Sequence, residues 1–499
     1  MRLTLNPEIT ALLELIRREC EQGEDLFLVG GAIRDGYLGR AINDLDFAME
    51  GDPTPLAKRV AKRLKVPFFL LDDERHTARI LYKNPEGKPS PLDFIQFTGD
   101  GLDEDLQNRD FTINAMAVPI RHLSRIIDPV NGQGDLGKGL LRPCSEHALL
   151  DDPVRVLRGI RLVLQYDLSF VDDLPTKMRA AALKLPENSY ERQRDEFFKI
   201  LEGPNPGEGI RCCRQFNVFD TLIPPISDQE GVPASPPHSL PLFDHTIAAV
   251  GYFAELLDCI KSGDVQEGLP WYLVHAVNEL SSFSSEINAF FSEEVTPGRS
   301  KRGLALLGTL LHDVGKPNTM TAGEGNRLHY YGHAREGSDL AWEAARKLQL
   351  SNAEAAWVQT MVRRHMDLLP LVNQKQPFSR QAIYRFFQQT GDAGVAIGLL
   401  SLADTLATYG ENLALDTWKM ALRITRGLFF AWWELQKAVV SPTLLLNGDD
   451  LQNEFGLEPG KQIGRLLDAL KEAQAVGKVT DRSEAKAFIR SRVNQNKGG

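Results

Sequence analysis

The chain has 499 residues, more than one hydrophobic core usually serves, and this length predicts several consecutively packed domains. Hydrophobic residues make up 42% and charged residues 25% of the sequence, values that exclude disordered and fibrous classes of protein. The formal net charge of −10 excludes a generally basic nucleic-acid coat, so any nucleic-acid site has to be a local basic surface.

Cysteine usage and apolar runs indicate the compartment. The five cysteines are odd in number, include one adjacent pair and lack paired zinc-ligand spacing, which predicts free thiols in a reducing compartment. The N-terminal segment carries charges throughout, and no later apolar run approaches the roughly 20 residues that span a bilayer. We therefore expect a cytoplasmic protein, or an organellar one after import, without membrane contact.

The first 140 residues predict an α/β domain. Residues 7–22 have the spacing of an amphipathic helix, and the apolar run LFLVGG predicts a buried strand that enters a tight turn. The segment DLDFAM predicts a second strand, and a helix over 54–65 separates it from the strand candidates PFFLL, ARILY and PLDFIQF.

Beyond about residue 150 the strand signals disappear, and apolar residues recur at helical spacing. The loop near 322–328, which carries glycine and asparagine, interrupts this helical part. The segment 224–241 is rich in proline, serine and glycine and predicts a linker. The predicted domains are therefore an α/β head at 1–140, a helical neck at 141–223, the linker at 224–241, a helical domain at 242–438 and a helical tail at 439–499.

The predicted head carries candidate phosphate and metal ligands. GGAIRD, which begins at Gly30, lies where a strand meets a helix start, and there glycines and helix amides can approach phosphate oxygens. Asp44 and Asp46 are spaced i, i+2, so in a strand both carboxylates point to one face. With Asp93 in PLDFIQF as a third ligand, they could hold the two divalent ions of nucleotidyl transfer. Alone, a D-x-D motif is also typical of solvated strand ends.

The neighbouring motifs favour the metal site. NRDFTINA at 108–115, DPVNGQGDL at 128–136, DDPVRVLRGIRL at 151–162 and ERQRDEFFKIL at 191–201 follow GGAIRD and DLD in order. Together they resemble the class II tRNA nucleotidyltransferase and bacterial poly(A) polymerase family. The resemblance covers the first 205 residues and resumes at NGDDLQNEFGLEPGKQIGRLLDAL. It implies a polymerase-beta-like α/β nucleotidyltransferase head, followed by all-helical neck, HD and tail domains, with tRNA contacts on the neck and tail.

The resemblance also implies residue roles. Asp44 and Asp46 would bind catalytic Mg²⁺, and Asp152 and Arg155 would serve as a protein template for the incoming base. The arginine that precedes Arg109 in the family is Asn108 here. The implied nucleotide-binding residues are Gly30, Gly31, Arg34, Arg109, Asp110, Asn114, Asp152, Arg155, Arg158 and Arg161.

The chemistry of Asp152 and Arg155 supports base reading. At i, i+3 the two residues share a helix face, so a carboxylate acceptor lies beside a guanidinium donor. Cytosine and adenine present an exocyclic amine beside an unprotonated ring nitrogen, whereas uracil and guanine present a carbonyl beside an N–H. The pair therefore predicts acceptance of CTP and ATP. The alternative is an intrahelical salt bridge worth about 0.3–0.5 kcal/mol.

A second set of ligands lies in the predicted helical domain at 242–438. LLGTLLHDVGKP has His312 and Asp313 at the end of an apolar helix, and the pattern resembles the HD metal-dependent phosphohydrolase superfamily. Imidazoles and carboxylates suit one or two transition ions that activate water against a phosphoester. A phosphatase or cyclic phosphodiesterase acting on RNA ends is thus a second predicted activity, and a degenerate scaffold is its alternative. The candidate ligands are His245, His312, Asp313, His333, His365 and Asp404.

Lone histidines are more often packed or surface side chains than ligands, so His238, His275 and His329 receive no role. The leading functional prediction is full CCA addition to tRNA from CTP and ATP, with no stable protein partner. Alternatives with the same chemistry add only CC, only the terminal A, or poly(A). Two other hypotheses make the HD domain the principal catalyst or the chain a noncatalytic RNA clamp.

Overall fold

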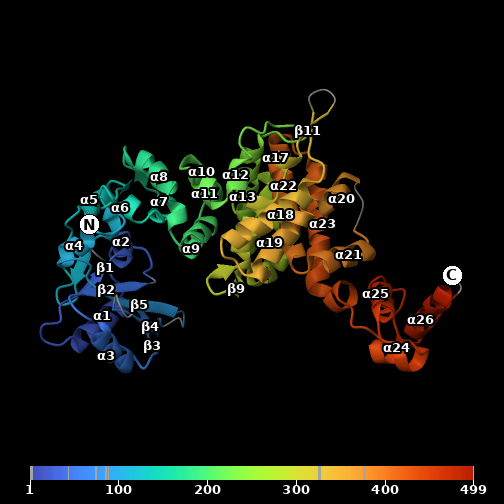
Figure 1. Ribbon diagram of the computed structural model, residues 1–499, viewed down its shortest axis with the longest axis horizontal. Coiled ribbons are helices and arrows are strands. Elements are labelled where there is room, and N and C mark those ends of the chain that lie inside the picture. The colour runs from blue at the N-terminus through green and yellow to red at the C-terminus, as the bar shows by residue number, and fades with distance from the viewer. Residues whose placement is uncertain are drawn as a thin grey trace. The chain divides into compact units, whose positions relative to one another are not determined.

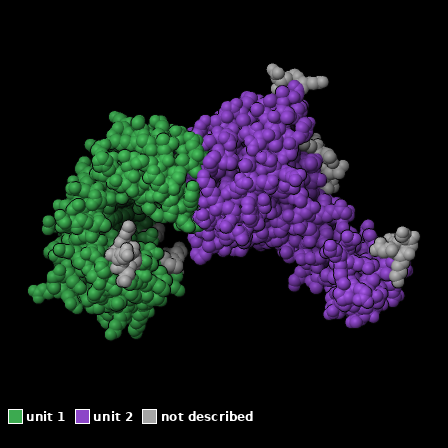
Figure 2. Space-filling view, in the orientation of Figure 1, with its two compact units in different colours: residues 1–196, 215–221 green, residues 197–214, 222–499 purple. Residues whose placement is uncertain are grey.

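The computed structural model describes residues 4–42, 44–72, 76–84, 87, 89–323, 327–374 and 378–497. The chain divides into two compact units, residues 1–196 with 215–221 and residues 197–214 with 222–499 (Figure 2). Figure 1 shows the long strands gathered in the N-terminal part of the chain, and helices dominate the remainder. The predicted α/β head followed by helices is confirmed.

The first unit is built on one six-stranded sheet with the strand order β3-β4-β5-β2-β1-β6. Neighbouring strands are antiparallel except for β2 and β5, which are parallel. In this register Asp46 on β2 lies directly opposite Asp93 on β5. The strands are β1 (Leu26–Val29), β2 (Leu45–Met49), β3 (Phe68–Asp72), β4 (Thr77–Lys83), β5 (Pro89–Gln96) and β6 (Ala117–Pro119).

Alternation of side chains sets which residues of β2 and β5 face the core. Phe47 and Phe94 are fully buried, and their rings stack with centroids 4.9 Å apart. Burying each ring contributes roughly 2–3 kcal/mol, which fixes the strand pairing strongly. Because side chains alternate along a strand, Asp46 and Asp93 point to the opposite face. Helix α3 (Thr54–Leu64) packs on β3 and β4, and α1 (Pro7–Glu19) packs on α3.

Strand structure does not end at residue 150, contrary to the sequence prediction. The later strands have two or three residues each, too short for a periodic apolar pattern to appear. These strands are β8 (Ser169–Phe170), which pairs with β7 (Leu140–Leu141), then β9 (Glu294–Thr296) with β10 (Arg299–Ser300), and β11 (Thr321–Ala322) with β12 (Leu328–His329). The predicted loop near 322–328 is the β11–β12 connection, and its residues 324–326 lie outside the described part of the chain.

Helices complete the first unit. They connect the sheet to the motifs at 108–115, 151–162 and 191–201. Their bounds are α2 (Gly31–Tyr37), α4 (Leu102–Gln107), η1 (Thr112–Asn114), α5 (Gly132–Gly137), α6 (Ala148–Asp151), α7 (Arg155–Tyr166), α8 (Leu174–Ala182), η2 (Leu185–Glu187), α9 (Tyr190–Leu201, whose last residues belong to the second unit) and α11 (Val218–Leu222).

The second unit is a helical bundle around α22 (Ala393–Tyr409). This helix packs against α13 (Leu242–Ser262), α19 (Asn352–Arg364) and α23 (Leu415–Glu434). Helix α22 is long and apolar enough to cross a membrane. However, 78% of its apolar window is buried inside the protein, so packing within the bundle explains its apolar composition. The other helices include α10 (Pro206–Gln215), α14 (Trp271–Leu280), α15 (Ser284–Ser292), α16 (Lys301–Leu311), α17 (Lys316–Thr319), α18 (His333–Lys347), α20 (Leu369–Gln374) and α21 (Arg380–Thr390).

The segment 224–241 contains more structure than a linker. Pro224–Ser227 forms α12, and Ile226, Val232 and Ser235 are buried. The predicted domain boundary there stays a prediction. The C-terminal part forms α24 (Gly448–Phe455), α25 (Lys461–Ala475) and α26 (Arg482–Lys497), which share a hydrophobic cluster of their own. All five cysteines are free, as predicted.

Candidate functional site

Two of the predicted head carboxylates lie side by side on the sheet. Asp46 and Asp93 are opposite one another on parallel strands, whose backbones are typically about 4.8 Å apart. Asp44 differs from the prediction, because β2 begins at Leu45 and Asp44 is an exposed residue just before it. Burial, together with the charges of Asp93 and Asp44, raises the pKa of Asp46 to about 6. Such crowding of carboxylates is typical of a divalent cation site.

The raised pKa of Asp46 predicts a pH effect. A divalent cation competes with the proton, so its affinity should fall as the pH drops through about 6. In cation-free protein the folded state holds this proton more tightly than the unfolded state, whose pKa is near 3.8. Stability without cation therefore decreases as the pH rises from about 4 to about 6. Cation titrations across this range check the first effect, and an unchanged affinity would contradict it.

Arg79 on β4 is a neighbour of this site that the sequence did not indicate. Its Nε and Nη2 atoms each donate to one oxygen of Asp93 at 2.7 Å. Such paired hydrogen bonds are strong. Asp93 can therefore bind an ion only through an oxygen that also accepts a hydrogen bond from Arg79. The ion pair depends on the β4–β5 register, which places Arg79 opposite Asp93, and sequence spacing alone does not reveal it.

Gly30 lies where the backbone passes closest to the carboxylates. It has a φ of 77°, and an added Cβ would lie 3.3 Å from Arg109 Nη1 and 3.5 Å from Asp46 Oδ2. A side chain here would therefore be strained and would crowd both charged groups. Arg109 is held by Asp105, whose Oδ2 accepts from Arg109 Nη2 at 3.0 Å. Gly31 opens α2 directly after this turn.

Four more predicted residues form one buried network next to this turn. Arg34 donates to Asn114 and Tyr166, and its guanidinium lies 4.2 Å from the Tyr166 ring centroid. Asn114 Nδ2 donates to Asp110 Oδ1 at 3.2 Å. Burial alone would raise the pKa of Asp110, but its ion pair with Arg158 lowers it below its ordinary value. The network therefore keeps an ionised carboxylate and two arginines in fixed positions.

Arg161 lies apart from this network. Its Nε donates to Glu196 Oε2 at 2.8 Å, and Glu196 also lies 3.7 Å from Arg158. Glu196 thus links two arginines of α7 to α9. Because Arg161 is bound by this carboxylate, its position supports a bracing role as well as the implied phosphate contact.

The predicted base-reading pair is not on one helix. Asp152 precedes Pro153, a position that disfavours helical backbone, and its φ of −142° and ψ of 89° separate α6 from α7. Arg155 is the first residue of α7, and its Nε still lies 3.9 Å from Asp152 Oδ2. The turn therefore keeps donor and acceptor adjacent, although the helix predicted across them is broken.

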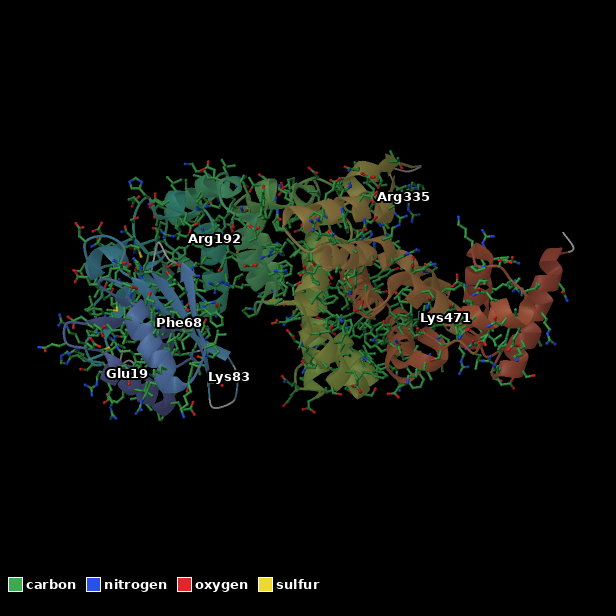
Figure 3. The ribbon with its side chains drawn as sticks, turned by 60° about the horizontal axis from the view of Figure 1, so that its bottom comes forward. Glu19, Phe68, Lys83, Arg192, Arg335 and Lys471 are labelled. Atoms are coloured by element: carbon green, nitrogen blue, oxygen red, sulfur yellow. The ribbon has the colours of Figure 1, made fainter. Side chains whose placement is uncertain are left out.

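The two oxygens of Asp152 differ in their surroundings. Oδ2 accepts from Arg192 Nη2 at 2.6 Å, and Figure 3 labels Arg192, which lies on α9. Oδ1 is buried and has no hydrogen-bond partner among the described residues. A buried acceptor without a donor is costly, so this oxygen is suited to receive a hydrogen bond from a ligand. Arg192 was not predicted, because salt bridges between distant helices leave no local pattern.

Arg155 is oriented by the backbone. Its Nη1 donates to the carbonyls of Arg109 and Ala148 at 3.2 Å, and its Nη2 donates to Asn108 at 3.0 Å. These contacts connect the pair of Asp152 and Arg155 to the segment that also carries Arg109. Since a guanidinium has five N–H donors, some remain for a base.

The predicted HD ligands of the second unit converge in one buried cluster. The groups His245, His312, Asp313 and Asp313, His333, His365 each place ligand atoms within 4.8 Å of one another. Asp313 Oδ2 lies 3.2 Å from His312 Nε2, and its Oδ1 lies 3.5 Å from His333 Nε2. Asp404 on α22 completes the set, since its Oδ1 lies 3.1 Å from His245 Nε2. One carboxylate thus faces two pairs of imidazoles, a geometry that fits two bridged ions.

Backbone carbonyls orient three of these imidazoles. The Nδ1 atoms of His312, His333 and His365 lie 2.7 to 2.8 Å from the carbonyl three residues earlier. A carbonyl only accepts, so each Nδ1 carries a proton, and each Nε2, once deprotonated, has a lone pair for a metal ion. Contacts with Asp313 and Asp404 outweigh burial and raise the pKa of His312 to about 10, so an ion has to displace the proton on its Nε2. Nitrogen and carboxylate donors of this kind suit zinc, iron, nickel or manganese, so the residues fit the implied transition metal.

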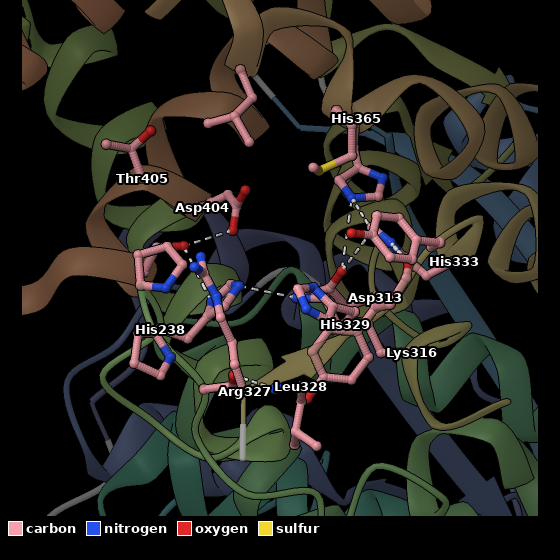
Figure 4. Close-up of a pocket in the computed structure, with 18 of the residues that line it drawn as sticks. His238, Asp313, Lys316, Arg327, Leu328, His329, His333, His365, Asp404 and Thr405 are labelled. Atoms are coloured by element: carbon pink, nitrogen blue, oxygen red, sulfur yellow. Dashed lines mark hydrogen bonds and ion pairs between the residues drawn. The ribbon is translucent and has the colours of Figure 1, made fainter. Parts of the chain in front are cut away.

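Four members of the cluster line a cavity of about 400 Å³ (Figure 4), namely Asp313, His333, His365 and Asp404. Lys316 Nζ lies 2.5 Å from Asp313 Oδ2 and 3.2 Å from His238 Nε2. Burial and the adjacent Lys316 lower the pKa of His238 to about 4, so this imidazole is neutral. His238 and His329 line the cavity, although neither was assigned a role from the sequence. His275 does not line it.

The mixed sheet with its clustered carboxylates and the helical remainder define a nucleotidyltransferase. The family model of the poly A polymerase head domain matches residues 26–142. An A-adding tRNA nucleotidyltransferase of Deinococcus radiodurans is 30% identical over 477 residues, which cover 94% of this chain and 96% of that protein. A CC-adding tRNA nucleotidyltransferase of Thermus thermophilus is 30% identical, with 93% of each chain covered. The chain belongs to the tRNA nucleotidyltransferase family, as predicted, and is an enzyme of that class.

Other comparisons agree with this assignment. A multifunctional CCA protein of Legionella pneumophila is 29% identical over 353 residues, which cover 69% of this chain and 75% of that protein. A CCA-adding enzyme solved with ATP superposes with a TM-score of 0.62 at 21% identity, with 98% of this chain and 96% of that chain covered. The Thermotoga maritima CCA-adding enzyme solved with tRNA gives 0.56 at 21% identity, with the same coverage. At these identities the solved structures bear out the fold.

Proposed function

We propose that this chain transfers nucleotides from CTP or ATP to the 3′ end of tRNA without a nucleic-acid template. The observation that carries the proposal is the pairing of Asp46 with Asp93 on adjacent parallel strands, with Asp44 next to them. Asp44 and Asp46 would hold Mg²⁺, whose two ions activate the attacking 3′-hydroxyl and neutralise charge on the leaving pyrophosphate. Relatives over almost the full chain are tRNA nucleotidyltransferases.

The arginines around the carboxylates would position the triphosphate. The charges of Arg109 and Arg158 both act on Asp46 and favour its ionised form. The Arg34–Asn114–Asp110 network fixes the floor beneath them, so a bound triphosphate would meet donors that do not have to reorganise. In-line attack by the 3′-hydroxyl then breaks the bond to pyrophosphate, and the nucleotide is joined to tRNA.

The buried Oδ1 of Asp152 would accept the exocyclic amine of cytosine or adenine, while Arg155 donates to the neighbouring ring nitrogen. Uracil and guanine would present a carbonyl to that oxygen and an N–H to the guanidinium. A site built on such hydrogen bonds can reject mismatched bases by about 10⁴-fold, because buried polar groups are left unpaired. Base choice would therefore reside in the protein.

The extent of addition separates two candidates. Complete CCA addition is the leading prediction from the sequence. Among the sequence relatives described above, the A-adding and CC-adding enzymes match over more than nine-tenths of this chain, whereas the multifunctional CCA protein matches over 69%. This difference favours a partial reaction, either CC or the terminal A.

The deciding experiment supplies Mg²⁺ and tRNAs that end before the tail, after C or after CC, with CTP, ATP or both. Products are resolved at single-nucleotide length. Growth that stops at CC or needs a CC end supports partial addition, and ordered growth to CCA supports the complete reaction. Long A runs would indicate a poly(A) polymerase. Absence of growth on every tRNA would overturn the proposal.

We propose metal-dependent phosphoester hydrolysis as a second function of the HD cluster. The observation that favours it is the convergence of four imidazole Nε2 atoms and two carboxylates in one cluster, of which Asp313, His333, His365 and Asp404 line an open cavity. Transition ions bound there would activate water against a phosphorus atom. Asp313 and Asp404 stay ionised. His312 and Lys316 outweigh burial at Asp313, and His245 and His312 outweigh it at Asp404, so both pKa values lie well below the ordinary range.

His312→Ala should remove this hydrolysis while leaving tRNA extension unchanged, because only the HD cluster loses a ligand. Hydrolysis of adenosine monophosphates by protein loaded with manganese, nickel or zinc is the measurement. His275→Ala is the matched control, because His275 is a partly exposed histidine of the same unit that does not line the cavity. Loss of extension in His312→Ala, with folding intact, would show that the two functions are not separate.

A further inference from the structure

An exposed aromatic pair stands at the mouth of the HD cavity. The rings of His329 and Tyr331 stack with centroids 5.3 Å apart and an interplanar angle of 11°. Both residues line the cavity, and Tyr331 is 80% exposed. The exposed face of the Tyr331 ring offers an apolar aromatic surface on which a planar ligand can stack. Neither His329 nor Tyr331 belongs to the candidate metal ligands.

The aromatic pair is held in place by the short hairpin of β11 and β12. An added Cβ at Gly323 would lie 2.4 Å from His329 Nε2, so the His329 ring packs directly on the glycine backbone. Gly323 N donates to the Arg327 carbonyl at 2.7 Å, and Leu328 N donates to Ser235 Oγ at 3.1 Å. One face of the Tyr331 ring is therefore backed by a fixed imidazole, and the other face is free to stack on a ligand.

The cavity below the aromatic pair has the size and charge for a nucleotide. Its volume of about 400 Å³ is in the range of small-molecule sites. Lys316 and Arg327 line the same cavity and offer positive charge for a phosphate, next to the metal ligands. Figure 4 shows Lys316, Arg327 and His329 around the cavity that Asp313, His333 and His365 also line. A base-sized ring and a phosphate would thus find complementary groups within one cavity.

We propose that this cavity binds a nucleotide or RNA-end phosphoester with its base stacked on Tyr331 and its phosphate directed to the metal cluster. Tyr331 is then the residue that makes the site prefer nucleotides to simple phosphoesters. Hydrolysis of the bound ester rests on the second proposed function, but the stacking does not. Stacking on an aromatic ring tolerates any base, so the site selects the nucleotide class and not one sequence.

Binding is tested with the full chain carrying Tyr331→Trp, whose indole fluorescence reports on its own stacking. Manganese-loaded protein is titrated with adenosine monophosphate and with ribose 5-phosphate, which has the sugar and phosphate but no base. The parent chain has six tryptophans, so its signal is subtracted. The nucleotide should quench the indole fluorescence with saturation, whereas ribose 5-phosphate, which has no base to stack, should leave it unchanged. Equal quenching by the two ligands would overturn the proposal.

Phe430→Trp is the matched control, because Phe430 is 48% exposed in the same unit and does not line the cavity. The nucleotide should not quench it in that concentration range, and equal quenching would also overturn the proposal. Kinetics separate the two functions. Tyr331→Ala should raise KM for adenosine monophosphate about tenfold and leave glycerol 2-phosphate unchanged. If neither ester is hydrolysed by the parent protein, the phosphohydrolase function fails, and the fluorescence result still decides the stacking.

Discussion

Asp46→Ala should reduce tRNA extension by about 10³-fold or more, because a lost metal ligand removes several kcal/mol of transition-state stabilisation. Asp46 is the most buried of the three head carboxylates, and the charges of Asp93 and Asp44 already act on it. Single-turnover extension of tRNA with saturating CTP and ATP is the measurement. Affinity for tRNA should stay the same, since the loss concerns catalysis and not the RNA surface.

Asp103→Ala is the control for Asp46→Ala. Asp103 is an exposed carboxylate on α4 in the same unit, so its removal tests any general effect of lost negative charge. We expect this variant to extend tRNA at the parent rate. An Asp46→Ala protein that extends tRNA normally, with intact folding, would refute the proposed metal site.

Asp152→Asn should lower the preference for CTP and ATP over UTP and GTP by about 10²-fold or more. The amide group keeps the shape of the carboxylate but can donate to the carbonyl of uracil or guanine, so this mismatch is relieved and only the N–H that faces Arg155 stays unpaired. Ratios of kcat/KM for the four nucleotides, measured on one tRNA, give the change. Because Asn is isosteric, the turn at Pro153 should persist, and circular dichroism checks that it does.

Asp172→Asn provides the comparison, because Asp172 is exposed in the same unit and belongs to no site described here. Its base preference should equal that of the parent chain. Arg192→Ala adds a second test, since Arg192 holds only Oδ2 of Asp152. We expect it to weaken selectivity less than Asp152→Asn does. Unaltered selectivity in Asp152→Asn would assign base choice to other residues.

Much of the head could be predicted from the sequence, because its strands are buried and carry strong patterns. The predicted segments LFLVGG, DLDFAM and PLDFIQF contain β1, β2 and most of β5, and the helix predicted over 54–65 became α3. The short strands after residue 137 carry no such pattern. The helix expected across Asp152 and Arg155 failed for a local reason, since proline restricts the residue before it.

The candidate sites were predictable where motifs carry them and not where distant elements meet. The HD ligands were recognisable from their order along the chain, and the structure brings all six together. Arg79, Arg192 and His238 contact the sites through strand pairing or helix packing, which depend on the folded chain and not on local spacing. From the sequence alone, the charged or polar side chains of these three residues indicate solvated surface positions.

The parallel pairing of β2 with β5 has a consequence for how this protein acquires activity. Asp46 and Asp93 come together only when the chain between them, which forms α3, β3 and β4, crosses over to bring β5 alongside β2, since a parallel pair needs a crossover connection. A slip of one residue would turn Asp93 toward the core and bring an apolar neighbour to its place. Partly folded nascent chains therefore have no assembled carboxylate pair, so catalysis begins only when this register is complete.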